Sequence, residues 1–151
     1  DVDAARANGA AIWCIDTYRT KTADLADHFV AIRPGTDGAL ALGMMYVLVR
    51  DGLTDEAFLS ANVLGWEEMK EKVIPRCTPE ETEKITGVPR AVVEELAHAY
   101  GKARAPFIRL GSGQSRYRNG AMTSRLITCL PALVGAWGKT RRWNSYFGRS
   151  F

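Results

Sequence analysis

Three short apolar runs, each ended by polar or turn-forming residues, constrain the fold of this chain more than any other feature. They cover residues 10–15, 29–32 and 106–110, and helical patterns lie between them. Continuous apolar runs of this length are typical of buried parallel strands. Strands that alternate with helices form a parallel sheet, because parallel strands need a crossover connection. The sequence therefore predicts an α/β domain of three layers, Rossmann-like, with a mostly parallel sheet flanked by helices.

The helices are predicted from amphipathic spacing and from terminal signals. Leu40, Met44 and Leu48 share the apolar face of one helix. Thr78 is placed as an N-cap, with Pro79 at the first helical position. The predicted helical ranges are 4–8, 22–27, 36–51, 54–61, 66–74, 79–86, 89–101 and 119–134.

Composition and charge narrow the class of protein. The 151 residues are 46% hydrophobic and 25% charged, which suffices for one domain with a core. No apolar run approaches the roughly 20 residues that a membrane span needs. The first residues include neither an initiator Met nor a signal-peptide pattern, so we expect a piece cut from a longer protein.

The charges are distributed unevenly. Residues 1–100 hold 10 basic against 17 acidic residues, a net charge of −7, whereas residues 101–151 hold 10 basic residues and no acidic one. Such a segment either faces an anion, or an acidic surface of another domain, or is a basic solvated face. The sequence carries no signature of a nucleic-acid-binding module, so nucleic acid is not an expected partner.

The cysteines indicate no disulfide framework. Cys14, Cys77 and Cys129 are odd in number, far apart and without a CxxC motif, and only His28 and His98 could join them at a metal. We expect Cys14 and Cys129 to be buried thiols, because both lie in apolar stretches. Free thiols favour a reducing compartment such as the cytoplasm over the periplasm.

Three loops, 16–20, 33–37 and 111–120, follow the predicted strands, where parallel sheets bind their ligands. Asp16 would either contact a ribose or a base, or bond the backbone amides of its own turn. Either Thr36 or Asp37 alone could cap the following helix, which leaves one of the two free for a ligand. The Asp37 carboxylate offers two acceptors for the ring N–H and amino group of guanine, a pair that adenine does not present.

The third loop superficially resembles a phosphate loop. It lacks the Lys-Ser/Thr of a P-loop, and Arg116 stands where a dinucleotide fingerprint has its third glycine. Exposed amides flanked by Arg109, Arg116 and Arg118 nevertheless suit a pyrophosphate. The sequence shows no catalytic set and no metal-ligand cluster. From the residues alone, the prediction is an α/β domain that binds a nucleotide-like anion.

Read in order, the loops resemble one family. Residues 14–23 look like the stretch IDPRxTxTA, and residues 32–43 look like IRPGTDxALALG, of the molybdopterin oxidoreductases. This is the dimethyl sulfoxide reductase family, which includes formate dehydrogenases and nitrate reductases. The match continues at residues 86–88, 108–113, 116–120 and 130–135, although Thr17 and Tyr18 replace the usual proline. We therefore expect a molybdopterin guanine dinucleotide-binding α/β domain at 1–138 and an atypical tail at 139–151.

The resemblance implies a bis(molybdopterin guanine dinucleotide) cofactor with molybdenum or tungsten, of which this domain binds one half. It implies that residues 16–20 contact the guanosine and pyrophosphate side and that residues 35–37 hold the guanine. Gly111, Gln114 and Arg116 would lie near the pterin and the substrate funnel. The candidate cofactor-binding residues are Asp16, Thr17, Tyr18, Arg19, Thr20, Gly35, Thr36, Asp37, Gly111, Gln114 and Arg116.

No catalytic or metal-ligating residue is expected in this chain. The resemblance implies that the whole protein is an oxidoreductase whose iron–sulfur cluster and metal ligand lie elsewhere in the parent chain, so that the fragment alone is inactive. The expected partners are the other domains of the parent and an iron–sulfur electron-transfer subunit. The alternative is a stand-alone guanine-nucleotide or anion-binding α/β module without redox activity.

Overall fold

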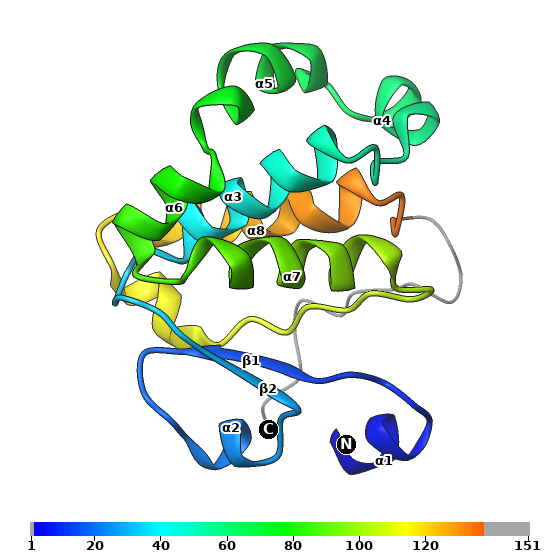
Figure 1. The fold of residues 1–151 in the computed structure, drawn as a ribbon. Helices are drawn as coiled ribbons and strands as arrows, with labels where there is room; N and C mark the ends of the chain where they lie inside the picture. The colour runs from blue at the N-terminus through cyan, green and yellow to red at the C-terminus, as the bar shows by residue number, and fades with distance from the viewer. Residues whose placement is uncertain (1, 138–151) are drawn as a thin grey trace.

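A layer of helices lies on one side of a small parallel sheet in the computed structural model, which describes residues 2–137 (Figure 1). Two short helices lie on the other side of the strands (Figure 1). The sheet consists of β1 (Trp13–Asp16) and β2 (His28–Ala31), and the two short helices are α1 (Val2–Ala7) and α2 (Lys21–Asp24). The helical layer consists of α3 (Asp37–Arg50), α6 (Pro79–Thr86), α7 (Arg90–Lys102) and α8 (Gly120–Leu133). Further out lie α4 (Glu56–Asn62), α5 (Trp66–Lys72) and the 3₁₀ turn η1 (Ile74–Arg76), while a second turn, η2 (Ser112–Arg116), precedes α8.

The two strands pair in parallel, and the helix α2 forms the crossover connection between them. Their register sets Trp13 opposite His28 and Asp16 opposite Ala31. The rings of Trp13 and His28 stack with centroids 4.0 Å apart. The first strand begins later than predicted, because pairing with β2 starts only at Ile12, whose carbonyl accepts the N–H of His28.

The prediction of a third strand at 106–110 is wrong for the described residues. This segment pairs with no described strand, and the sheet of the described residues consists of β1 and β2 alone. Ile108 and Leu110 still pack against the core, as strand residues would. The described part of the chain thus combines eight α-helices with a two-stranded parallel sheet, consistent with the α/β class. The three-layer Rossmann-like arrangement stays a prediction.

Helix α3 forms the centre of the core. Its residues Leu40, Met45 and Leu48 are almost fully buried, and the helix packs against α6, α7 and α8. The approach of α6 requires a glycine in α3, since a Cβ at Gly43 would overlap the side chain of Thr82. This close packing holds α3 tightly against α6 in the helical layer.

The predicted helices are present, most with ends shifted by one to three residues. Thr78 caps α6 by accepting a hydrogen bond from the N–H of Glu81 (3.3 Å), and Gly87 ends it at φ 76°. The predicted tail at 139–151 lies outside the described residues. Within the described part, no helix combines the length and apolar character needed to cross a membrane.

Candidate functional site

The loop after β1 holds its own turn together. Oδ1 of Asp16 accepts the N–H of Thr17 (2.8 Å), which is the local alternative to ligand binding. Thr20 caps α2 by accepting the N–H of Ala23 (3.4 Å). Arg19 pairs with Asp24 (2.9 Å) and lies over the ring of Phe29. These contacts leave the side chains of residues 17 and 18 exposed to solvent.

The loop after β2 is anchored to the end of α6. The backbone N–H of Arg33 donates to the carbonyl of Thr86 (2.9 Å), and its guanidinium donates to the carbonyls of Lys84 and Ile85. These carbonyls belong to the last turn of α6, where a helix leaves acceptors without intrahelical donors. The loop therefore has a fixed position relative to the helical layer.

Neither candidate cap of α3 is used as a cap. Thr36 occupies the N-cap position, but its hydroxyl donates to the carbonyl of Arg33 (2.7 Å) and accepts no hydrogen bond from the helix. The carboxylate of Asp37 instead accepts a hydrogen bond from Nε2 of Gln114 (Oδ1, 3.3 Å). Because the side chain of Asp37 faces another loop, capping does not explain the acidic residue at this position.

The loops after β2 and after residue 110 form one surface. Besides the contact of Asp37 with Gln114, the ring of Tyr117 lies against Gly35, where an added Cβ would be 3.1 Å from Cδ1 of the ring. Gly35 has φ 75°, so a residue with a side chain would also be strained there. Tyr117 was not predicted as a site residue, and only its position between Arg116 and Arg118 could have pointed to it.

One acceptor on this surface has no donor. Oε1 of Gln114 is buried and accepts no hydrogen bond from any residue in the described part. A buried carbonyl oxygen without a donor costs about 1–3 kcal/mol. A ligand with an N–H group would remove that cost, so the pair of Asp37 and Gln114 is suited to a hydrogen-bond donor.

The remaining candidates of the third loop are solvent-exposed. Gly111 and Arg116 lie on the surface, and a Cβ at Gly111 would meet no atom within 4 Å. Within residues 2–137, no hydrogen bond or ion pair joins this loop, or the pair of Asp37 and Gln114, to residues 16–20. The basic residues between 101 and 137 are all exposed and form no ion pair with a described acidic residue. They are Lys102, Arg104, Arg109, Arg116, Arg118 and Arg125.

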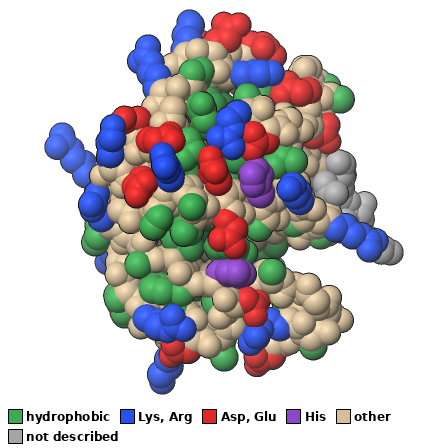
Figure 2. All heavy atoms as spheres, viewed as in Figure 1, with side chains coloured by type: hydrophobic (Ala, Val, Ile, Leu, Met, Phe, Trp, Pro, Cys, Tyr) green, Lys and Arg blue, Asp and Glu red, His purple; other side chains and the backbone are tan. Residues whose placement is uncertain are grey.

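The face of the molecule seen in Figure 2 carries charges of both signs. Acidic and basic side chains alternate over it without a large area of one sign (Figure 2). Between the end of α3 and α7, Arg50 bonds Asp51 (2.7 Å) and Glu94 (2.9 Å), and Nε2 of His98 lies 2.6 Å from Oδ2 of Asp51. The hydrogen bonds from Arg50 and then His98 hold the pKa of the Asp51 carboxyl well below its usual range. This network clamps α3 to α7.

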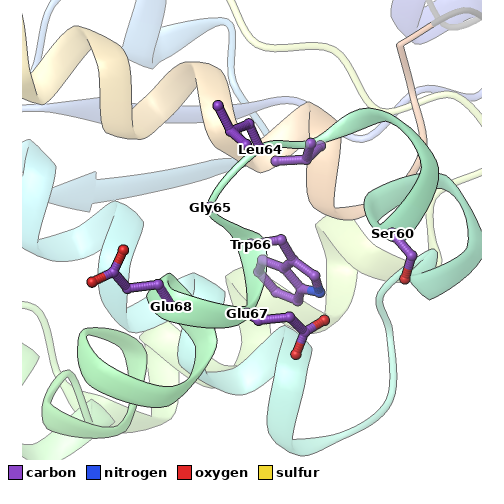
Figure 3. Close-up of a pocket in the computed structure, with 7 residues that line it drawn as sticks. Ser60, Leu64, Gly65, Trp66, Glu67 and Glu68 are labelled. Atoms are coloured by element: carbon purple, nitrogen blue, oxygen red, sulfur yellow. The ribbon is translucent and has the colours of Figure 1, made fainter.

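A pocket of about 460 Å³ lies at the turn between α4 and α5 (Figure 3). The buried Trp66 and the fully exposed Leu64 are both among the residues that line it. None of the predicted site residues lines this pocket. It carries no cluster of ionisable groups beyond the two neighbouring carboxylates of Glu67 and Glu68, so its chemistry is that of an apolar surface depression.

The cysteines are more exposed than predicted. Cys14 and Cys129 are half-buried rather than buried, as is Cys77, and none is in a disulfide. Cys14 follows Trp13 in β1, so the two side chains point to opposite faces of the sheet. Desolvation raises the pKa of all three thiols, and for Cys14 the charge of Asp16 raises it further. Within residues 2–137, His, Cys, Asp and Glu side chains form no group of three or more that could hold a metal.

A comparison with known protein families identifies the family to which this chain belongs. The sequence profile described as molybdopterin oxidoreductase matches residues 2–147. The chain belongs to the molybdopterin oxidoreductase family.

Relatives show how much of such a protein is present. The chain is 47% identical over 133 residues to the probable oxidoreductase YoaE of Bacillus subtilis and 35% identical over 135 residues to formate dehydrogenase H of Escherichia coli. It is 33% identical over 155 residues to dimethyl sulfoxide reductase DmsA of Haemophilus influenzae. The matches cover 88 or 89% of this chain but 19% of each relative. The chain therefore spans about one fifth of the length of these relatives.

A solved structure agrees with the fold. Acetylene hydratase from Pelobacter acetylenicus superposes with a TM-score of 0.86 at 28% sequence identity. The superposition covers 92% of this chain and 19% of that chain. Sequence and structure thus agree that this chain corresponds to about one fifth of a protein of the molybdopterin oxidoreductase family.

Proposed function

We propose that this chain binds one guanine dinucleotide half of a bis(molybdopterin guanine dinucleotide) cofactor within a molybdopterin-dependent oxidoreductase. The observation that carries the proposal is the hydrogen bond between Asp37 and Gln114, which joins two loops at one surface. Family membership supports a molybdopterin cofactor. The guanine dinucleotide form rests on the chemistry of the two side chains.

The acceptors of this pair fit the donor edge of guanine. An ionised carboxylate has about four lone-pair sites, of which Gln114 uses one. Oε1 of Gln114 adds a buried acceptor that lacks a donor. Guanine presents a ring N–H and an amino group side by side, so it can bond both acceptors, whereas adenine presents an acceptor at the ring position. The resemblance implied a place near the pterin for Gln114; since Asp37 and Gln114 are bonded to each other, we propose instead that both contact the guanine.

The pyrophosphate requires positive charge and free N–H groups. The exposed Arg116 and the open backbone around Gly111 supply both at the edge of the same surface. Thr17 and Tyr18, whose side chains are exposed beyond β1, are assigned to the guanosine and pyrophosphate side. When bound, the molybdenum or tungsten centre supplies the redox chemistry, while this chain binds and orients the dinucleotide.

The rest of the parent protein completes the enzyme. We infer that the metal ligand, the iron–sulfur cluster and the substrate site lie in the four fifths of the relatives' length that this chain does not span. The other domains, and an iron–sulfur electron-transfer subunit, are its proposed partners. The isolated fragment is accordingly inactive.

The test is the composition of the purified whole protein. Acid hydrolysis is expected to release GMP in proportion to molybdenum or tungsten measured by mass spectrometry. The Asp37→Ala variant lowers GMP per protein, while Glu67→Ala, an exposed carboxylate on α5, leaves it unchanged. Recovery of a free guanine nucleotide without pterin or metal would instead identify a stand-alone nucleotide-binding module. Absence of guanine from a metal-loaded protein contradicts the proposal.

A further inference from the structure

The ring of Tyr117 lies face-on against the loop that follows β2. A Cβ at Gly35 would be 3.1 Å from Cδ1 of the ring, 3.4 Å from Cγ and 3.5 Å from Cε1. Three such similar distances place the Cβ position above the face of the ring, because an approach within the ring plane would leave Cγ and Cε1 much farther away than Cδ1. One face of the Tyr117 ring is therefore covered by Gly35.

The opposite face of the ring is open to solvent. Tyr117 is 42% exposed, and with one face covered, this exposed area lies on the other face and on the ring edge. Packing of the two loops against each other explains the covered face of the ring. It does not explain why an aromatic side chain presents its second face to solvent beside the acceptors of Asp37 and Gln114.

The backbone holds the open face of the ring in a fixed place. The N–H of Tyr117 donates to the carbonyl of Gln114 (3.3 Å), and the carbonyl of Tyr117 accepts the N–H of Gly120 (2.9 Å), the first residue of α8. On the other side of the contact, Arg33 anchors the loop that contains Gly35 to the end of α6. A ligand that stacks on this ring therefore does not have to order it first, which favours binding.

The open face lies within reach of a base that is bound at the acceptor pair. Gly35 precedes Asp37 by two residues, which span at most about 7 Å. Gln114 lies one turn of η2 before Tyr117, a rise of about 6 Å. Proteins that read a single base combine hydrogen bonds to its edge with an aromatic side chain against its face. Asp37 and Gln114 offer the first kind of contact, and Tyr117 offers the second.

We propose that Tyr117 is a further binding residue of this site, whose open ring face stacks on the purine base that Asp37 and Gln114 hold at its edge. This inference rests on the proposed function, which assigns Asp37 and Gln114 to the guanine. The two kinds of contact differ in what they recognise. Hydrogen bonds at the edge select guanine, whereas stacking tolerates any base, because every base has a π-face. Tyr117 thus adds affinity for the base, and Asp37 adds selectivity.

Nucleotide affinity of the cofactor-free whole protein tests the stacking, with GDP, ADP and inorganic pyrophosphate as probes. Tyr117→Leu removes the ring and is expected to weaken GDP binding roughly 5- to 150-fold, the range of base–aromatic stacking. ADP binding weakens by the same factor, so the preference for GDP over ADP is kept. Pyrophosphate has no base, so its affinity is unchanged, which also shows that the variant is folded. Tyr117→Phe keeps the ring and therefore keeps the affinity for GDP.

Phe107→Leu is the matched control, because it removes another exposed aromatic ring that lies outside the two loops. All three affinities are expected to stay unchanged in this variant. A loss of pyrophosphate affinity in Tyr117→Leu as large as the loss of GDP affinity would show that the ring only shapes the loop, and it would overturn the stacking. An affinity for GDP equal to that of the unchanged protein overturns it as well.

Failure of the stacking and failure of the guanine assignment give different results. An unchanged protein that prefers GDP to ADP, with no loss of either affinity in Tyr117→Leu, refutes the stacking alone. An unchanged protein that binds both nucleotides equally, with an equal loss of both in Tyr117→Leu, refutes guanine recognition and supports the stacking of a purine. Binding of neither nucleotide contradicts both.

Discussion

Nε2 of Gln114 lies 3.3 Å from Oδ1 of Asp37, which precedes it by 77 residues. The bond joins the start of α3 to the turn η2 and turns the Asp37 carboxylate away from its own helix. It leaves the pair with more acceptors than donors, because Oε1 of Gln114 is unpartnered among the described residues. Both partners can be tested separately.

Replacing Asp37 distinguishes guanine recognition from a local structural role. Asp37→Ala is expected to weaken guanine-nucleotide binding by roughly 1.5–3 kcal/mol, as for hydrogen bonds to a charged group. Asp37→Asn weakens it nearly as much, because the amide turns a donor toward the donors of guanine. Affinity is measured on the cofactor-free whole protein with GDP as the probe and ADP as the control. Asparagine that equals aspartate in both GDP affinity and melting temperature contradicts the assignment.

Introducing a second carboxylate at Gln114 is expected to make stability depend on pH. In Gln114→Glu the two acids lie within hydrogen-bond reach, so each raises the pKa of the other in the folded protein. A raised pKa favours the folded state at low pH, and this advantage is lost as the pH rises from about 4 to 7. Each unit of raised pKa corresponds to about 1.4 kcal/mol of lost stability at neutral pH.

The control for this prediction is Gln114→Met, which has a similar shape but no charge. Its melting temperature is expected to follow that of the unchanged protein at every pH. A Glu variant whose melting temperature tracks the Met variant from pH 4 to 7.5 shows that the two side chains do not interact.

Acid is expected to weaken the clamp between α3 and α7. The lowered pKa of Asp51 means that its contribution to stability is present above about pH 4, the unfolded value, and is lost as the pH falls toward the lower folded value. Asp51→Asn should cost roughly 1 kcal/mol at pH 7, a small value because the pair is partly exposed. Urea unfolding at pH 7 and pH 3 measures the difference. An equal loss at both pH values argues against an ionic contribution.

A methyl group at Gly43 is expected to disturb the contact of α3 with α6. Gly43→Ala places a Cβ against Thr82 and should destabilise the protein by about 1–3 kcal/mol, as overpacked cores do. The double variant Gly43→Ala with Thr82→Ala makes room for the new Cβ, so the two changes should be less costly together than their sum. Additive losses in thermal unfolding would show that the contact is not the cause.

The sequence predicted the helices well because their signals are local. Thr78, Pro79 and Gly87 mark both ends of α6 within the segment itself, and the structure confirms them. The strand at 106–110 was predicted from the same kind of local pattern but is unpaired among the described residues. A short apolar run indicates an extended backbone. A strand also needs a partner strand, which another part of the chain must supply.

The candidate site shows the same division. The position of Asp37 before a helix was visible in the sequence, and so was the alternative that it caps that helix. Its contact with Gln114 is not visible, because no local pattern relates residues 77 positions apart. The placement of Tyr117 over Gly35 is likewise a product of tertiary packing. The other assigned contacts with the cofactor stay predictions.

Arg33 sets a boundary for recombination among relatives. Its backbone and guanidinium satisfy the last carbonyls of α6, so the loop at 33–37 and the helix end at 84–87 hold one another in register. A chimaera that takes one of these segments from a relative and keeps the other combines two segments that did not evolve to form these hydrogen bonds with each other. Grafts that move residues 33–87 together preserve these hydrogen bonds, so crossover points within this range are the ones to avoid.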